Sequence, residues 1–253
     1  MLTRRELAEH AAARGVPEAQ ILRDELISHV LAALPELTAG DLRFIGGTAL
    51  CRTHLPGFRL SEDVDLLVAD PPSTRDELSG LLPRMLRREY PDTTVDWLRE
   101  GSTWSGELDG GRGLTVRIQL IGLDASYARY PTGPAPVELR YRDLPDAVEL
   151  RVPTAPGAAA MKLNAWAERA APRDLCDLFG LLEAGLLDAA ALEIARGVSA
   201  RVQPHVFDDG RLPSTDSWRT ALSAQMRVPP SRADAFHRVR IALAQLAGWD
   251  VDR

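Results

Sequence analysis

The spacing of apolar residues predicts two helices at the start of the chain. Thr3 and Glu6 have the spacing of a capping box, which predicts a helix over residues 4–14. A second helix is predicted over residues 17–34, because apolar side chains recur there every three or four positions. These side chains are Leu26, Ile27, Val30, Leu31 and Leu34. Pro35 lacks the backbone N–H that a longer helix needs and is expected to end it.

Short apolar segments separated by turn residues then predict a sheet. The expected strands are residues 42–45, 63–68, 93–98 and 114–121. Between them we expect a short helix from Gly46 to about residue 55, and a longer helix over residues 75–90. The other segments are expected to form a turn or hairpin at 106–113, a loop at 131–136, and an edge strand or bulge at 137–141.

The pattern becomes helical after residues 153–156, where closely spaced prolines mark a junction. The helices expected beyond it are 157–170, 173–185, 188–201, 215–226 and 232–247. This order of elements predicts an α+β fold, in which a small mixed sheet with helices is followed by a helical C-terminal part. We therefore expect two domains, residues 1–152 and 153–253.

The composition indicates a globular protein and excludes some classes. Of the 253 residues, 45% are hydrophobic and 26% are charged. The sequence has neither a run of about 18 apolar residues nor a signal-peptide pattern, so we expect no membrane association. The widely separated Cys51 and Cys176 fit a reducing, cytoplasmic location. A pI near 5.5 argues against indiscriminate binding to nucleic acid, although residues 211–240 carry a local excess of arginine.

Two neighbouring segments suggest a site for a metal-bound nucleotide. Asp63 and Asp65 alternate with apolar residues in the second expected strand, so their carboxylates point to the same side. Such a pair offers the hard oxygen ligands that Mg²⁺ prefers, with Mn²⁺ as an alternative. Gly46, Gly47 and Thr48 form a turn at the start of a helix, where backbone N–H groups can hold phosphate.

Lys162 is a further candidate, because it is the single lysine among 30 basic residues. Arginine has replaced lysine at every other basic position, whereas a compact ammonium at a phosphate is not interchangeable with a guanidinium. Arg173 and Asp177 lie four residues apart in the following expected helix and share one of its faces. They are either an ordinary surface pair, or Asp177 orients Lys162 or Arg169 toward a nucleotide.

These segments resemble the AbiEii/AbiGii-type, or MenT-like, nucleotidyltransferase toxins, whose fold is similar to that of the polymerase-β superfamily. The first matching block comprises residues 44–50 and 59–66. The second resembles the family pattern K-L-x-A…R…R-D-x-x-D-L through residues 162–165, Arg169 and residues 173–178. The resemblance covers about residues 20–185, and no motif matches beyond them.

The resemblance implies an enzyme that transfers a nucleoside monophosphate from an NTP and releases pyrophosphate. It implies RNA as the acceptor, with tRNA 3′ ends the acceptor class of some members. The positions that it assigns are Gly47 and Thr48 for phosphates, Asp63 and Asp65 for the metal, Ser61 in the same cleft, and Lys162 and Asp177 in a second essential motif. Arg59, next to the acidic strand, is expected to meet the triphosphate.

One position departs from the pattern of polymerase-β-like enzymes, which usually have a third carboxylate on a neighbouring strand. Gln119 stands where that acid is expected. Three alternatives follow: a weak second metal, a charge supplied by Asp96, or a site with one metal.

The leading hypothesis is a monomeric, cytoplasmic toxin that depends on Mg²⁺ and modifies RNA, with a cognate antitoxin as partner. Two alternatives use the same residues. The first is a nucleotidylyltransferase acting on a small molecule or protein, and the second is a nucleotide-binding module without turnover. A modification of Ser61 would add negative charge beside the metal acids and block the cleft.

Overall fold

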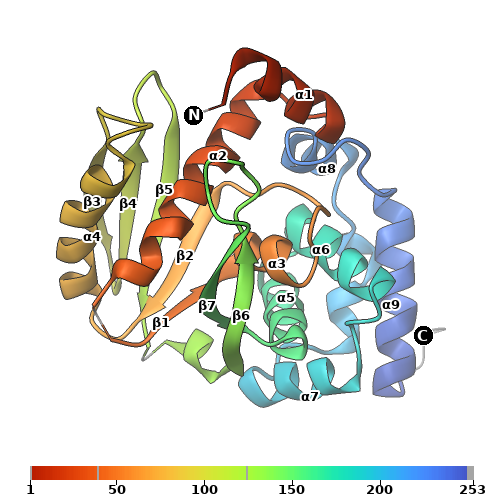
Figure 1. Cartoon of the computed structure of the whole chain (residues 1–253). Coiled ribbons are helices and arrows are strands. Elements are labelled where there is room, and N and C mark those ends of the chain that lie inside the picture. Colours follow the sequence, from red (N-terminus) through yellow and green to blue (C-terminus); the bar gives the residue numbers. More distant parts are fainter. Residues whose placement is uncertain (1, 39, 124, 250–253) are drawn as a thin grey trace. The chain divides into compact units, whose positions relative to one another are not determined.

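The computed structural model describes every residue except 1, 39, 124 and 250–253. The chain divides into two compact units. Unit 1 comprises Met1–Ala128 and Thr132–Val152, and unit 2 comprises Arg129–Pro131 and Pro153–Arg253. Figure 1 shows the sheet in unit 1 and the helices α5 to α9 in unit 2. A mixed sheet followed by a helical region confirms the α+β fold predicted from the sequence.

Unit 1 is built on a five-stranded sheet with the strand order β1-β2-β5-β4-β3. The strands are β1 (Leu42–Ile45), β2 (Asp63–Val68), β3 (Thr94–Glu100), β4 (Thr103–Asp109) and β5 (Thr115–Gly122). β2 and β5 run parallel, whereas the other neighbouring pairs are antiparallel. The parallel pair places β2 and β5 next to each other although nearly fifty residues separate them in the sequence.

Apolar side chains of one sheet face pack against α2 (Glu18–Ala33) and α4 (Pro71–Leu86). This core includes Val64, Leu66, Ile118 and Leu120 from the strands, Leu26 and Val30 from α2, and Leu78 and Leu82 from α4. Because neighbouring strand residues point to opposite faces, burying these residues leaves Asp63 and Asp65 on the other face. The alternation of the sequence therefore decides which face carries the acids.

The other elements of unit 1 surround this sheet. They are α1 (Arg4–Arg14), η1 (Leu34–Glu36), α3 (Gly46–Thr53), η2 (Ser126–Arg129), and a two-stranded sheet of β6 (Thr132–Glu138) and β7 (Ala147–Pro153). Thr3 caps α1 through the predicted reciprocal hydrogen bonds with Glu6. Figure 1 shows β6 and β7 side by side and apart from the five-stranded sheet.

Unit 2 consists of helices packed around aromatic side chains. Its elements are α5 (Ala155–Arg169), α6 (Pro172–Glu183), α7 (Ala189–Val198), η3 (Pro204–Phe207), η4 (Asp209–Arg211), α8 (Thr215–Leu222) and α9 (Arg232–Ala247). The Trp166 ring centroid lies 5.7 Å from that of Phe207 and 6.1 Å from that of Phe236. The indole Nε1 of Trp166 donates to the Val206 carbonyl at 2.9 Å, so this tryptophan anchors the core of unit 2.

The strand β7 was not expected from the sequence, and three other segments differ from the expectations because proline and glycine were interpreted as breaks. α4 begins at Pro71, where Asp70 caps the helix and accepts from the Ser73 N–H at 3.1 Å. Residues 103–109 form a strand between β3 and β5, in which Gly106 leaves room for the Trp97 ring. Residues 132–138 form a strand in a two-stranded sheet that tolerates proline. Within the described part of the chain, no helix is long and apolar enough to cross a membrane.

Candidate functional site

The two candidate metal ligands lie at the start of β2, on the face of the sheet opposite to α2 and α4. Asp63 and Asp65 are half-buried, whereas Val64 and Leu66 between and after them are fully buried. Their Cα atoms are about 7 Å apart by strand geometry, so their carboxylates can converge on one ion above the sheet. Two carboxylates in this arrangement fit a divalent cation that prefers oxygen ligands.

The glycine turn packs directly against this acidic pair. Gly46 has a φ of +83°, and a Cβ atom built on it would lie 2.2 Å from Oδ2 of Asp65. Only glycine therefore allows α3 to begin this close to the carboxylate. The Thr48 hydroxyl donates to the Asp63 carbonyl, which ties the first turn of α3 to β2. The structure thus brings together residues that the sequence placed in one phosphate and metal site.

Arg59 and Ser61 lie against the same turn. A Cβ atom on Gly47 would be 2.8 Å from Nη2 of Arg59 and 3.4 Å from Oγ of Ser61. Arg59 is only 2% exposed, and its Nη1 donates to the Leu60 carbonyl at 2.9 Å. A buried guanidinium at the first turn of a helix adds positive charge where phosphate oxygens would bind.

Arg117 on β5 contacts Asp63 of the acidic pair and was not predicted from the sequence. It lies opposite Asp63 in the parallel register, and its Nε donates to Oδ1 of Asp63 at 3.1 Å. Its Nη2 lies 3.1 Å from Oδ2, so the guanidinium engages both carboxylate oxygens. These hydrogen bonds raise the pKa of Arg117 above its ordinary value. A parallel pairing across about fifty residues gives no local sequence signal that would have identified this contact.

The register also locates the position of the expected third acid. Gln119 lies opposite Asp65 on the adjacent strand, and Ser105 of β4 lies opposite Gln119. Asp96 belongs to β3, which is three strands away from β2, or about 14 Å at the usual strand spacing. Asp96 is therefore too distant to share a metal ion with Asp63 and Asp65.

A second cluster of charged residues lies in unit 2, on α5 and α6. Nζ of Lys162 is 2.8 Å from Oδ2 of Asp177 and 3.2 Å from Oδ1 of Asp174. Arg169 donates to both oxygens of Asp174, from Nε at 2.7 Å and from Nη2 at 3.0 Å. Both aspartates are fully buried, and Lys162 is 8% exposed. The single lysine of the chain thus bridges two buried carboxylates.

Asp174 is the member of this cluster that sequence reasoning missed. Asp174 and Asp177 are three residues apart on α6, a spacing that places both carboxylates on one helix face. That spacing could have identified Asp174 as a neighbour of Asp177 from the sequence. Arg173, which precedes Asp174, is half-buried on the same helix.

Two side chains close in sequence to the candidate residues lie in the interior of their units. Arg52, which follows the glycine turn, is 2% exposed, because it donates to Asp24 and to the Ser28 hydroxyl inside unit 1. Trp166, four residues after Lys162, fills the core of unit 2.

The model of the family "Nucleotidyl transferase AbiEii toxin, Type IV TA system" matches residues 29–244. No curated protein sequence matches significantly.

Among solved structures, the chain is similar to MenT4, a nucleotidyltransferase toxin from Mycobacterium tuberculosis, with 20% identity and a TM-score of 0.70 over 100% of this chain and 92% of that one. It also matches an antigenic nucleotidyltransferase-like protein from Paracoccidioides brasiliensis, with 14% identity, a TM-score of 0.43, and coverage of 70% and 87%. A third match is terminal uridylyl transferase 4 from Trypanosoma brucei, with 13% identity, a TM-score of 0.27, and coverage of 94% and 66%.

The family model covers both candidate clusters, from α2 to α9. The likeness to MenT4 extends over the whole chain and shows the same fold. The chain therefore belongs to the AbiEii nucleotidyltransferase toxin family of type IV toxin–antitoxin systems and is an NTP-dependent nucleotidyltransferase.

Proposed function

We propose that this enzyme transfers a nucleoside monophosphate from a Mg²⁺-bound NTP to RNA, with a tRNA 3′ end as the acceptor, and thereby blocks translation in the cytoplasm. The observation that carries the proposal is the contact between the glycine turn and the acidic pair, in which Gly46 leaves Oδ2 of Asp65 directly beside the first turn of α3. A phosphate site and a metal site are thereby adjacent, as transfer from a metal-bound triphosphate requires.

Different residues of unit 1 are proposed to bind the metal ion and the phosphates. Asp63 and Asp65 would hold Mg²⁺, with Mn²⁺ as the substitute. The backbone N–H groups of Gly46, Gly47 and Thr48 receive phosphate oxygens, and Arg59 adds a positive charge behind them. A metal held by Asp63 and Asp65 would neutralise charge on the triphosphate and lower the pKa of the attacking hydroxyl. Gln119 beside Asp65 is neutral, which supports a site with two charged metal ligands.

In unit 2 we assign Lys162 to the departing phosphates. Asp177 and Asp174 hold its ammonium in one position, and Arg169 fixes Asp174 in turn. Such an arrangement pre-orders a flexible side chain, and electrostatic stabilisation of a transferring phosphate depends on that ordering. Arg173 is assigned to the same nucleotide site.

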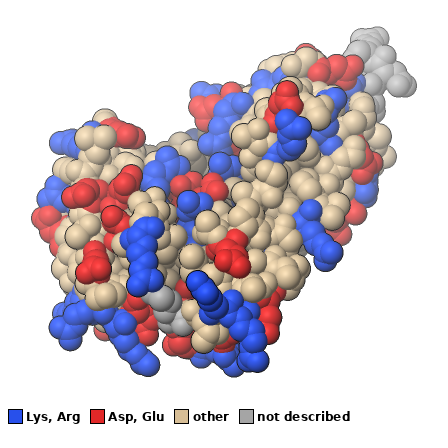
Figure 2. Space-filling model, turned by 90° about the horizontal axis from the view of Figure 1, so that it is seen from above, with Lys and Arg blue, Asp and Glu red and all other residues tan. Residues whose placement is uncertain are grey.

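The surface charge disfavours indiscriminate binding to nucleic acid, so the proposed contact with RNA has to be local. Figure 2 shows acidic and basic side chains interspersed over the face that it draws, without one continuous basic area. The overall pI near 5.5 agrees with this distribution. The arginine-rich residues 211–240 are the candidate contact with the acceptor backbone.

The test is incorporation of label from each of the four NTPs into total tRNA in the presence of Mg²⁺. We expect label at tRNA 3′ ends with the wild-type protein and none with Asp65→Asn. Label in a protein or small molecule but not in RNA would show that RNA is not the acceptor. Tight NTP binding without pyrophosphate release would indicate a non-catalytic module. We further propose that the enzyme acts as a monomer and is neutralised by a cognate antitoxin. Co-expression of the enzyme with the product of its neighbouring gene should then restore the growth of the host.

A further inference from the structure

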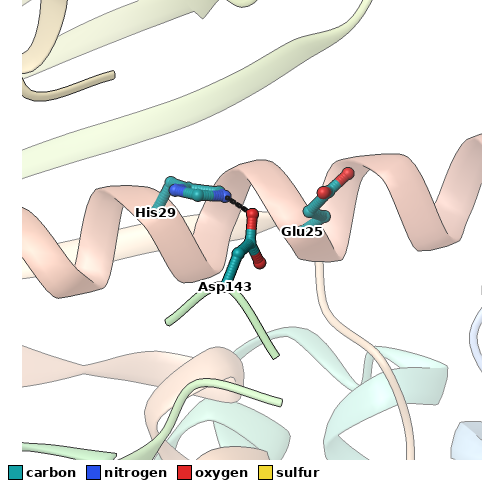
Figure 3. A group of neighbouring side chains, drawn as sticks. All are labelled: Glu25, His29 and Asp143. Atoms are coloured by element: carbon teal, nitrogen blue, oxygen red, sulfur yellow. Dashed lines mark ion pairs between the residues drawn. The ribbon is translucent and has the colours of Figure 1, made fainter. Parts of the chain in front are cut away.

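A separate group of metal-ligating side chains lies in unit 1 between α2 and the segment that joins β6 to β7. Glu25 and His29 are one helical turn apart on α2, and Asp143 comes from the joining segment. One ligand atom from each of the three residues lies within 4.8 Å of the other two. Figure 3 shows the His29 imidazole directed toward the Asp143 carboxylate, with Glu25 one turn earlier on the same helix. None of the three residues belongs to the nucleotide site described above.

The imidazole of His29 is buried but makes no hydrogen bond through Nε2. His29 is 7% exposed, and its Nε2 lies 3.5 Å from Oδ2 of Asp143, which is too long for a good hydrogen bond. Buried polar atoms are normally paired, because an unpaired one loses its hydration without compensation. The nitrogen therefore faces the Asp143 carboxylate at ion-pair distance without a hydrogen bond to it.

The gap between these two atoms has the size that a bound metal ion would span. Two ligands at about 2.1 Å from a tetrahedral Zn²⁺ are separated by about 3.4 Å. The observed separation of 3.5 Å matches this value, whereas a direct hydrogen bond would be shorter. Glu25, which is fully buried, supplies a third donor on the same helix face.

The neighbouring residues hold this arrangement in place. The Tyr90 ring meets the His29 ring edge-on, with centroids 5.6 Å apart and an interplanar angle of 76°. Glu25 accepts from the Leu2 N–H through Oε1 at 2.7 Å, which fixes the carboxylate. Asp143 is exposed, so an ion has access from solvent. Outer contacts of this kind orient the ligands of metal sites.

We propose that Glu25, His29 and Asp143 form a second metal site, selective for Zn²⁺ over Mg²⁺, with solvent at the fourth position. The imidazole nitrogen is the reason for this selectivity, because Mg²⁺ prefers an all-oxygen set such as Asp63 and Asp65. The ion joins the middle of α2 to the segment after β6, so its role is to stabilise unit 1.

The test is Zn²⁺ binding by the full-length protein after removal of metal with a chelator. Isothermal titration and thermal denaturation are measured for the wild type, Asp143→Asn, His29→Gln and the control Asp146→Asn, an exposed acid in the same segment. We expect one Zn²⁺ to bind and raise the Tm of the wild type and the control. Asp143→Asn, at an exposed position that leaves the fold intact, should weaken binding at least tenfold, and His29→Gln should abolish it.

Two further measurements separate this site from the nucleotide site. Asp65→Asn should leave the Zn²⁺ response unchanged, and Co²⁺ in place of Zn²⁺ should give the intense visible absorption of a tetrahedral ion only when Asp143 and His29 are present. Equal Zn²⁺ binding by the wild type and Asp143→Asn, or no binding by the wild type, would overturn the proposal. Loss in Asp65→Asn alone would place the ion in the nucleotide site and would overturn it as well.

Discussion

The guanidinium of Arg117 engages both carboxylate oxygens of Asp63, with Nε 3.1 Å from Oδ1 and Nη2 3.1 Å from Oδ2. A cation therefore already neutralises one of the two proposed metal ligands. A divalent ion that binds Asp63 competes with this guanidinium for the same carboxylate, whereas a metal-bound NTP offers Arg117 new anionic partners among its phosphates. The contact thus favours binding of the metal together with the nucleotide over binding of the metal alone.

Replacing Arg117 by Gln should raise the affinity for Mn²⁺ in the absence of nucleotide. An ion pair that is partly exposed contributes up to about 1 kcal/mol, which corresponds to a two- to fivefold change in affinity. The measurement is the electron paramagnetic resonance signal of free Mn²⁺ during a titration. Arg112→Gln is the matched control, because this exposed arginine carries the same charge in the turn before β5. An equal gain in both variants would mean that net charge, not the contact with Asp63, sets the affinity.

The close approach of Gly46 to Asp65 predicts a specific effect of Gly46→Ala. The new Cβ atom would lie 2.2 Å from Oδ2 of Asp65, so either the turn or the carboxylate has to move. We expect the loss of Mn²⁺ binding and of nucleotidyl transfer, together with a loss of about 1 kcal/mol in unfolding free energy for the left-handed backbone.

Gly57→Ala separates the two effects of that substitution. Gly57 also has a positive φ, of +75°, but a Cβ atom there meets nothing within 4 Å. It should show the same loss of stability in urea denaturation while metal binding and activity persist. Loss of activity in Gly57→Ala, or full activity in Gly46→Ala, would contradict the assignment of the turn.

The sequence predicted the contacts of this site that lie between residues close together in the chain, and it missed those between distant segments. The strand alternation around Asp63 and Asp65 and the turn at Gly46 are local, and the structure has them where the pattern placed them. The pairing of Asp63 with Arg117 requires the parallel register of β2 and β5, which no local pattern specifies. The strand at 103–109 was missed because the role of Gly106, to admit the Trp97 ring, is visible only once β3 and β4 are paired.

Burial of charge was the least predictable property of the chain. Asp24, Arg52 and Arg140 are far apart in sequence, yet both guanidiniums contact Oδ1 of Asp24, at 2.7 and 3.2 Å. Each of these three residues is of a charged type that usually lies at the protein surface. Only the tertiary fold reveals that they form a buried network.

This buried network predicts how stability depends on pH. Burial alone raises the pKa of Asp24, but Arg52, Arg140 and the Tyr141 hydroxyl outweigh it and hold that pKa below the ordinary 3.8. A carboxyl group whose pKa is lowered in the folded state stabilises the fold above its unfolded pKa, and that contribution is lost as pH falls through the folded value. The free energy of unfolding should therefore be steady from neutral pH to about 4 on account of Asp24 and decrease below it.

Urea denaturation of Asp24→Asn checks this dependence. At neutral pH the variant leaves two buried guanidiniums without their shared counter-charge and should lose about 3–5 kcal/mol. The difference from the wild type should shrink below pH 4. Asp76→Asn is the control, since Asp76 is 69% exposed and should lose less than about 1 kcal/mol. A pH-independent difference for Asp24→Asn would contradict the assignment.

Lys162→Arg tests whether the single lysine serves the nucleotide or only the fold. The substitution keeps a positive charge between Asp174 and Asp177, so unfolding free energy should change by less than about 1 kcal/mol. Nucleotidyl transfer should fall by about tenfold or more, because a planar fork does not reproduce a compact ammonium at a phosphate. Lys162→Met is the structural comparison and should be strongly destabilised. Wild-type turnover in Lys162→Arg would leave Lys162 with a role in stability alone.

The neutral Gln119 offers a gain-of-function prediction. Gln119 lies opposite Asp65 on the adjacent parallel strand, so Gln119→Glu adds a third carboxylate next to the proposed metal ligands. Because the affinity for hard cations rises with the number of charged oxygen ligands, Mn²⁺ binding should tighten by about three- to tenfold. Thr115→Glu is the matched control, since it adds the same charge four residues earlier on β5, on the same face of the sheet. If both variants bind Mn²⁺ equally well, the gain in affinity comes from the added negative charge at any position on this face, and Gln119 does not border the metal.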